Sequence, residues 1–290
     1  MNLRTISQRI GAIEVSEGAG VKLRRSIGLP ALRHLDPFLM LDHFSSDDPD
    51  DYLAGFPDHP HRGFVTLTYM LDGHMLHQDS MGNRGDLRAG GAQWMKAASG
   101  VIHSEAPQQT NGLMRGFQLW INLPAAQKMS EPAYQEYAAS AIPTIRAGGT
   151  LVRVLSSEYR DHRGPIQDPH SELCYLDVEL SPGKTFRHGV AEGLDGFVYP
   201  FDGELRVDGK RLPTHELGVL GKGDTVVVEA GAQGARFILV AGRPIKEPVV
   251  QYGPFVMNTR EEIEQALADY RDDRLVRTRA ALGQSRDRAA

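Results

Sequence analysis

The chain is poor in cysteine, with Cys174 as the single thiol among 290 residues. One thiol cannot form an intramolecular disulfide, and such low usage is typical of proteins kept in a reducing compartment. In the segment "SELCYLDVEL" apolar and polar residues alternate with period 2, which is typical of a β-strand. We therefore expect Cys174 to be a small apolar strand residue and not a catalytic thiol.

Long apolar runs and an excess of basic residues are also missing. No segment approaches the roughly 20 apolar residues of a membrane span, and the start "MNLRTISQRI" has no apolar run of signal-peptide length. The net charge of −5 works against nucleic-acid binding, because counterion release from DNA needs clustered Lys and Arg. We expect a cytoplasmic protein that makes no direct contact with nucleic acid or membrane.

Turn residues, in contrast, are plentiful, with 31 Gly and 17 Pro. They separate short alternating segments from about residue 10 to 122, among them "GFVTLTYMLDG" and "GFQLWINLP", and this pattern is typical of antiparallel strands. The polar segment at residues 124–143 interrupts the pattern, which resumes in "ELCYLDVELSPG" and "GDTVVVEAG". The sequence therefore predicts two β domains of similar size, residues 1–135 and 143–258, joined by a linker.

The last segment, residues 259–290, has a different pattern. Thr259 followed three residues later by Glu262 fits a capping box, and Ile263 and Leu267 recur at helical spacing. We expect a C-terminal helix that ends in a charged tail.

The stretch "FPDHPHRGFVTLTYML" sets His59 and His61 one residue apart in front of strand-forming residues. Residues two apart on a strand point to the same face, so two imidazoles there can converge on one metal ion. Taken alone, this spacing occurs more often in surface or hydrogen-bonded histidines than in metal ligands. A metal site needs further ligands from elsewhere in the chain.

Such ligands are offered by "AASGVIHSEAP", where His103 and Glu105 have the same spacing. If the two strands face each other across a small barrel, three imidazoles and one carboxylate meet and leave coordination positions open. This donor set suits a divalent first-row transition metal, and open positions beside such ligands are typical of non-haem iron oxygenases.

Several segments in a fixed order resemble the pirin family, a bicupin group of metal-binding proteins. They are "LDPFLMLDHF", "HPHRGFVTLTYMLDG", "HQDSMGNRGDLRAGGAQWMKAASGVIHSEAP", "GFQLWINLP" and "QYGPFVMNTREEI", and the likeness spans about residues 20 to 270. The resemblance implies an all-β chain with two cupin (jelly-roll) β-barrels, of which only the N-terminal one binds metal. It also implies that His59, His61, His103 and Glu105 are the four ligands.

Other polar residues allow more than one interpretation. His74 and His77 in "DGHMLHQDS" are expected to be solvated strand residues, with hydrogen bonding to a ligand or substrate as the alternative. Gln118, Trp120 and Asn122 alternate on one strand and share a face, which either lines a pocket or belongs to an ordinary buried strand.

The second half offers little chemistry. His188 stands where a cupin ligand can fall, but the later segment "GDTVVVEAGAQGARFILV" supplies neither a His nor a paired Glu. We expect this domain to be metal-free. The segment "LGVLGKGDT" is not a phosphate-binding loop, because Glu216 replaces its first Gly and Gly223 follows the Lys.

The resemblance implies a flavonol-cleaving dioxygenase, a quercetin 2,3-dioxygenase that consumes O2 and releases carbon monoxide, with Glu105 as general base. Fe(II) is the favoured metal, while Mn, Co, Ni and Cu also accept these ligands. The alternative is a pirin-type iron-dependent redox sensor that regulates a protein partner. A third possibility is another cupin reaction on a small oxygen-rich molecule. We expect a monomer, because the two barrels already pair within one chain.

Overall fold

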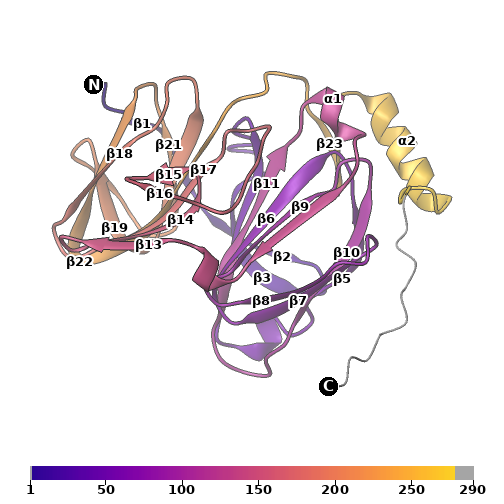
Figure 1. The fold of residues 1–290 in the computed structure, drawn as a ribbon, viewed down its shortest axis with the longest axis horizontal. Coiled ribbons are helices and arrows are strands. Elements are labelled where there is room, and N and C mark those ends of the chain that lie inside the picture. Colours follow the sequence, from indigo (N-terminus) through magenta and orange to yellow (C-terminus); the bar gives the residue numbers. More distant parts are fainter. Residues whose placement is uncertain (1, 278–290) are drawn as a thin grey trace.

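Alternating residues form antiparallel strands along most of the chain in the computed structural model, which describes residues 2–277 (Figure 1). The prediction of an all-β chain with two cupin barrels and a C-terminal helix is confirmed. Within the described residues the two α-helices are α1 (Ala125–Lys128) and α2 (Arg260–Arg271). None of the helices in that part of the chain has the length and apolar character needed to cross a membrane.

The N-terminal barrel consists of two sheets. The larger has seven strands in the order β12 (Ala133–Tyr137), β9 (Ala92–Lys96), β6 (Phe64–Asp72), β11 (Met114–Asn122), β4 (Phe38–Ser46), β3 (Val21–Ile27) and β2 (Ile13–Glu17). The smaller has four strands in the order β5 (Phe56–His61), β10 (Val101–Pro107), β7 (His74–Asp79) and β8 (Arg84–Arg88).

The C-terminal barrel is built on a nine-stranded sheet. Its main path is β1 (Ile6–Gly11), β21 (Glu216–Leu220), β19 (Asp195–Val207), β22 (Thr225–Gly242), β17 (Cys174–Leu180), β14 (Thr150–Ser156) and β13 (Thr144–Ala147), with β18 (Thr185–Gly189) on β22 and β20 (Lys210–Leu212) on β19. Two short ribbons complete the chain: β15 (Glu158–Tyr159) with β16 (His162–Arg163), and β23 (Val250–Tyr252) with β24 (Phe255–Met257).

The alternation within β6 shows how this fold separates a core from a cavity. Val65, Leu67 and Tyr69 belong to a hydrophobic cluster that also contains residues of the second barrel. Thr66 and Thr68, between them in sequence, point to the opposite face of the sheet, into the first barrel. The seven-stranded sheet therefore packs on the second barrel with one face and lines the interior of the first with the other.

Within residues 2–277, segments near both ends cross to the opposite barrel (Figure 1). Strand β1 pairs with β21 of the C-terminal sheet. The ribbon β23–β24 and helix α2 return to the first barrel, where Arg62 forms a β-bridge with Phe255. Ile263 of α2 and Ile102 of β10 belong to one hydrophobic cluster. The predicted limits of the two domains remain a prediction, to which the structure adds this exchange of termini.

Helix α2 begins as the sequence predicts. Thr259 accepts a hydrogen bond from the Glu262 backbone, and the Glu262 carboxylate caps the Thr259 N–H in return. Ile263 is buried against the first barrel, whereas Leu267 is 38% exposed, so the helical spacing of these two residues does not define one buried face. The charged tail from residue 278 onward lies outside the described residues.

The segment predicted as a linker has regular structure. It contains α1 and a 3-10 turn at Ala139–Ala141, and between them β12 pairs with β9 at the edge of the seven-stranded sheet. The polar residues of this segment are those of an edge strand and its flanks, which is why the alternation expected of a buried strand is absent.

Candidate metal centre

Two neighbouring strands of the four-stranded sheet bring the predicted ligands together. Strands β5 and β10 are antiparallel, and His59 lies directly opposite His103. The register shifts between His103 and Glu105, so Glu105 lies opposite Phe56 instead of continuing the alignment. The His59–His61 pair and the His103–Glu105 pair, each with one residue between its members, therefore lie on neighbouring strands.

The three histidines form a compact group of possible ligands. One ligand atom each of His59, His61 and His103 lies within 4.8 Å of the others. Glu105 belongs to a second group of the same tightness, with His103 and His77. His103 is thus common to both groups, and the Glu105 carboxylate lies toward the His77 side of it.

Burial keeps the imidazoles of His61 and His103 neutral. His61 and His103 are 2% and 1% exposed. Burial, and then the neighbouring histidines, hold the pKa of each well below its usual 6.5. Nδ1 of His61 and Nε2 of His103 are buried without a hydrogen-bond partner. Neutral imidazoles with unpartnered nitrogens inside a protein fit a metal ion, which is bound by that form of histidine.

His59 is oriented by the backbone. Its Nδ1 lies 2.8 Å from the Pro57 carbonyl oxygen, an acceptor, so Nδ1 carries the proton and donates. The lone pair then remains on Nε2, which is left for a ligand. Hydrogen bonds of this kind fix the tautomer of metal-binding histidines in many proteins.

The Glu105 carboxylate is held by two polar side chains of the seven-stranded sheet. Thr68 Oγ1 lies 2.6 Å from Gln118 Oε1 and donates its single proton there. This contact turns the Gln118 amide nitrogen toward Glu105 Oε2, at 3.5 Å. Thr68 Oγ1 also lies 3.4 Å from Glu105 Oε1, so both contacts with the carboxylate are long and weak.

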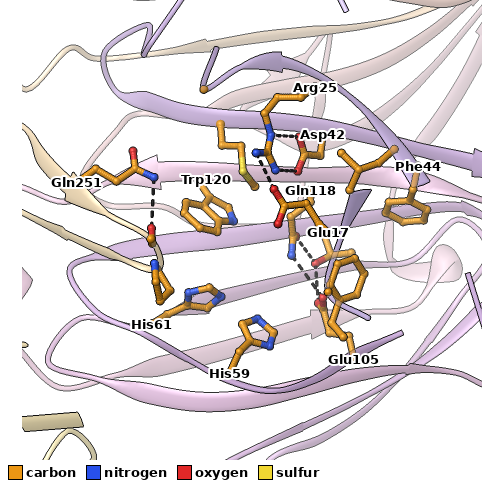
Figure 2. A pocket seen from close by; sticks show the side chains of 18 of the residues that line it. Glu17, Arg25, Asp42, Phe44, His59, His61, Glu105, Gln118, Trp120 and Gln251 are labelled. Carbon is orange, nitrogen blue, oxygen red and sulfur yellow. Dashed lines mark hydrogen bonds and ion pairs between the residues drawn. The ribbon is translucent and has the colours of Figure 1, made fainter. Parts of the chain in front are cut away.

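A cavity of about 910 Å³ opens above these residues (Figure 2). This volume lies at the upper end of the range for small-molecule sites, which is roughly 300–1,000 Å³. His59, His61 and Glu105 line it, and Trp120 stands over His61 with ring centroids 5.2 Å apart. Its apolar wall is aromatic and methionine-rich: Met40, Phe44, Phe56, Met75 and Trp120.

A charged group lies within this wall, because Asp42 falls between Met40 and Phe44 on the inward face of β4. Arg25 makes a two-pronged ion pair with Asp42, at 2.7 Å for both contacts, and also reaches Glu17 at 2.8 Å (Figure 2). Burial raises the pKa of Asp42 to about 6, even though Arg25 opposes this. Two carboxylates share one guanidinium, so this wall is rich in hydrogen-bond acceptors.

The polar residues that the sequence left open have separate outcomes. Gln118 and Trp120 line the cavity. Asn122 does not, because its side chain accepts a hydrogen bond from the buried Lys128 at 2.6 Å. His74 pairs with the exposed Asp86 at the surface. The expectation of a solvated His77 is wrong, since it is 1% exposed and contacts His103.

Sequence reasoning missed some residues of the site. Asp79 follows His77 by two positions, the same spacing as in the His59–His61 and His103–Glu105 pairs. This spacing could have identified it as part of the site. Arg25 and the segment 249–254 gave no local signal, because they reach the cavity only through the return of the chain from the second barrel and the curvature of the first.

The second barrel has a different interior. Cys174 is buried in β17, as expected, and burial raises the pKa of its thiol to about 12. His188 lies 3.9 Å from its sulfur, beside the ring of Phe186. Among residues 2–277, both groups of potential metal ligands lie in the first barrel.

Comparison with known proteins decides the family. The family model for pirin matches residues 20–121, and the model for the pirin C-terminal cupin domain matches residues 175–276. The chain belongs to the pirin family. The family match covers both barrels and confirms the resemblance seen in the sequence.

Three similar proteins show the extent of the similarity. A Pseudomonas aeruginosa protein named as a candidate quercetin 2,3-dioxygenase is 48% identical, over 89% of this chain and 93% of its own. Human pirin is 42% identical over 89% of each chain. The crystal structure of a quercetin 2,3-dioxygenase from Acinetobacter baumannii has a TM-score of 0.88, with 31% identity over 94% of this chain and 98% of its own.

Proposed function

We propose that this pirin is a metal-dependent dioxygenase that cleaves flavonols such as quercetin. The observation that carries the proposal is the position of the donor cluster: three histidines, two of them buried, lie together at one side of an aromatic-walled cavity of about 910 Å³. That volume suits a flat polyphenol. Similarity to the Acinetobacter baumannii enzyme supports the same activity class.

In this proposal His59, His61, His103 and Glu105 hold one divalent ion, with Fe(II) favoured and Mn, Co, Ni or Cu as alternatives. The Glu105 carboxylate joins the three histidines by a rotation of its side chain, since it now lies toward His77. A redox-active metal there supplies the chemistry that pairs O2 with an electron-rich flavonol.

The protein's own residues bind the substrate and move one proton. Trp120 and Phe44 offer flat apolar surface to the flavonol rings, and the acceptors of Glu17 and Asp42 suit its outlying hydroxyl groups. Glu105 accepts the proton of the flavonol 3-hydroxyl as general base, because its weak contact with Gln118 leaves it free to turn. Both oxygen atoms of O2 enter the ring-opened ester, and one ring carbon leaves as carbon monoxide.

The test is carbon monoxide release and O2 uptake with quercetin, using protein loaded anaerobically with one equivalent of Fe(II). We expect carbon monoxide release that matches O2 uptake. Both should disappear in His61→Ala and persist in His188→Ala, the matched control in the second barrel. Fully loaded protein that binds flavonols but consumes no O2 with any of them contradicts the proposal.

A second candidate, an iron-dependent sensor that regulates a protein partner, is favoured by one contact. Arg62, next to His61, donates at 2.7 Å to Asp269 of helix α2. Leu267 and Tyr270 of that helix are exposed, so a change at the metal site has a direct connection to a surface helix. Full iron loading without turnover favours this function. A partner that binds equally to metal-free, ferrous and ferric protein removes it.

A further inference from the structure

Behind His103, on the side away from the cavity, lies a buried pair that the proposed reaction does not use. His77 and Asp79 are consecutive inward residues of β7, with side chains 2% and 0% exposed. The register of β7 on β10 sets Asp79 opposite His103 and His77 opposite Glu105. All four side chains therefore share one face of the sheet.

Asp79 is surrounded by donors. Its Oδ1 accepts from the backbone N–H groups of Met81 at 2.9 Å and Asn83 at 3.0 Å. Its Oδ2 accepts from Asn83 Nδ2 at 2.8 Å and faces His77 Nε2 at 3.2 Å. A carboxylate with these partners acts as acceptor only, so His77 carries its proton on Nε2.

The tautomer of His77 then decides that of His103. With its proton on Nε2, His77 presents a lone pair at Nδ1, which lies 3.4 Å from His103 Nδ1. A hydrogen bond between these two nitrogens needs a proton on one of them. Because His77 Nδ1 has none, His103 carries its proton on Nδ1. The remaining nitrogen, Nε2, has a free lone pair and no partner among the described residues. The His77 ring is fixed in place by stacking on Tyr134, with centroids 5.1 Å apart.

We infer that Asp79 and His77 form a relay of hydrogen bonds that sets the tautomer of His103 and directs its Nε2 to the metal. The inference rests on the metal-binding part of the proposed function. His77 is thus a positioning residue and not a fifth ligand, although it is close enough to His103 and Glu105 to be counted with them as a possible one. Supporting groups of this type typically change metal affinity by about 10–100-fold.

Asp79→Asn tests the relay with little change in shape. The two backbone N–H groups keep the amide oxygen at the Oδ1 position, so the amide nitrogen replaces Oδ2. It donates one proton to His77 Nε2 and the other to Asn83, whose amide turns its oxygen inward to accept it. His77 must then carry its proton on Nδ1, and His103 must move its own to Nε2, where it blocks the metal. Asp86→Asn is the matched control, since Asp86 pairs with His74 on the same sheet at the surface.

His77 variants separate the relay from direct ligation. His77→Gln keeps one acceptor and one donor at a similar spacing, so the relay is retained while an imidazole ligand is lost. His77→Leu removes both groups. The relay predicts near-normal affinity for the first variant and loss for the second, whereas a ligand role for His77 predicts loss in both.

The measurements are Co(II) affinity by calorimetry, the Co(II) visible spectrum, and the tautomers of His77 and His103 in metal-free protein by long-range ¹H–¹⁵N NMR. We expect Co(II) binding about 10–100-fold weaker in Asp79→Asn and His77→Leu, and unchanged in Asp86→Asn. Wild-type affinity in Asp79→Asn, loss in His77→Gln, or a wild-type His103 protonated at Nε2 overturns the relay. None of these readouts depends on quercetin, so they are judged separately from dioxygenase turnover.

Discussion

The two barrels of this pirin are both built from antiparallel strands but differ in the side chains that fill them. In the first barrel, β5 and β10 place His59 opposite His103 and His61 opposite Val101. In the second, β18 and β22 are also antiparallel, and their facing pairs are Phe186 with Val228 and His188 with Val226. One strand pair presents imidazoles to a cavity, whereas the other closes a hydrophobic core.

This difference shows how much apolar packing a barrel gives up to hold a metal centre. The interior of the second barrel is a single cluster of buried apolar residues, which includes Phe186, Val226 and Val228. The first barrel replaces such residues by unpartnered imidazole nitrogens beside a large cavity, and it is covered by chain from the far end of the sequence. The smaller sheet of the first barrel supplies metal-binding groups in place of packed apolar side chains. The second barrel supplies a packed apolar core.

The largest effect is expected from removing a proposed ligand in the first barrel. His61→Ala takes one of three clustered imidazoles, and we expect the protein to lose its single equivalent of Fe(II) almost completely. The reason is that a direct ligand contributes more than the 10–100-fold of a supporting residue. Elemental analysis after gel filtration measures the loss. A reduced metal content in the His188→Ala variant would contradict this difference between the two barrels.

In the second barrel the large effect is on folding. Phe186 is 2% exposed in the apolar cluster, and Phe186→Ala is expected to lower the free energy of unfolding by about 3–5 kcal/mol through lost burial and a cavity. Metal-free His61→Ala is the comparison: its loss of stability is expected to be smaller, because the truncation also removes a buried nitrogen that has no partner. Urea titration measures both. An equal loss of stability in the two variants contradicts the division of roles.

Between the barrels, a buried histidine makes stability depend on pH. Burial, followed by His215, Arg115 and Arg24, holds the pKa of His43 well below 6.5. Below about pH 6.5 the unfolded chain binds a proton that folded His43 does not, so stability falls as the pH drops from 7 toward 5. The contribution reaches about 1.4 kcal/mol per pH unit.

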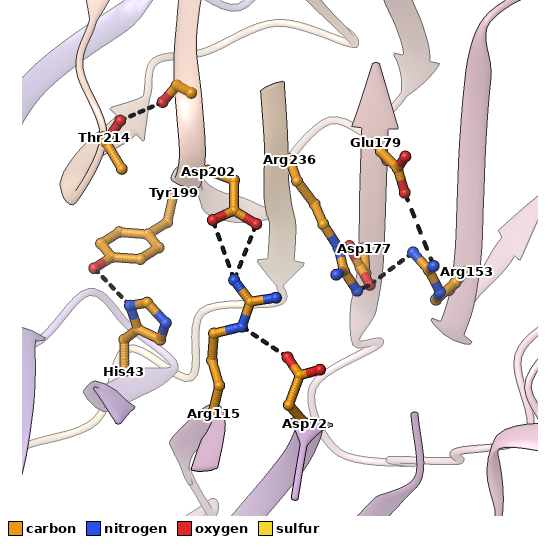
Figure 3. A network of polar contacts seen from close by, with 11 residues as sticks. His43, Asp72, Arg115, Arg153, Asp177, Glu179, Tyr199, Asp202, Thr214 and Arg236 are labelled. Carbon is orange, nitrogen blue, oxygen red and sulfur yellow. Dashed lines mark hydrogen bonds and ion pairs between the residues drawn. The ribbon is translucent and has the colours of Figure 1, made fainter. Parts of the chain in front are cut away.

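His43→Phe is expected to remove that contribution, since the ring already stacks on Phe117 and contacts Tyr199 across the interface (Figure 3). Urea unfolding at pH 7.0 and 5.5 measures the change. His162→Phe, at an exposed position of the second barrel, is the control. A pH slope that is the same in His43→Phe and wild type shows that this histidine does not titrate on unfolding.

The smallest effect is expected from the ion pair that joins the barrels. Arg115 of the first barrel contacts both Asp202 oxygens of the second, at 3.1 and 3.0 Å (Figure 3). The Asp202 side chain is 50% exposed, so Asp202→Asn should cost only about 0.2–1 kcal/mol, and less in high salt. Urea titration with and without 0.5 M NaCl compares it with Glu158→Gln, which breaks an exposed pair inside the second barrel. A cost well above this range indicates that the pair is shielded from solvent.

Much of the first barrel was predictable because its signals are local. Period 2 in "GFVTLTYML" gave the strand that became β6, and the spacing of His59 with His61 and of His103 with Glu105 gave shared faces. The capping box at Thr259 gave the start of α2. Each of these rests on neighbours within a few residues, which sequence periodicity records.

The wrong expectation for His77 and the alternative that the sequence left open for Asn122 have a different physical origin. His77 was expected to be solvated, because nothing in its own strand shows that β10 and Tyr134 of β12 cover it. Asn122 shares a face with Gln118 and Trp120, yet it lies where Lys128 occupies the space beside it. When a distant segment buries a residue, the alternation of apolar and polar residues around that residue does not reveal the burial.

The sequence by itself determined the strands, the division into two β domains and the pairs of donors, because backbone alternation fixes which residues share a face. Only the tertiary structure decided the depth of the cavity, the acceptor-rich wall around Arg25, the turn of Glu105 toward His77 and the relay behind His103. These depend on registers between strands and on the exchange of both chain termini between the barrels. Contacts between segments hundreds of residues apart are set by packing, which no local pattern encodes.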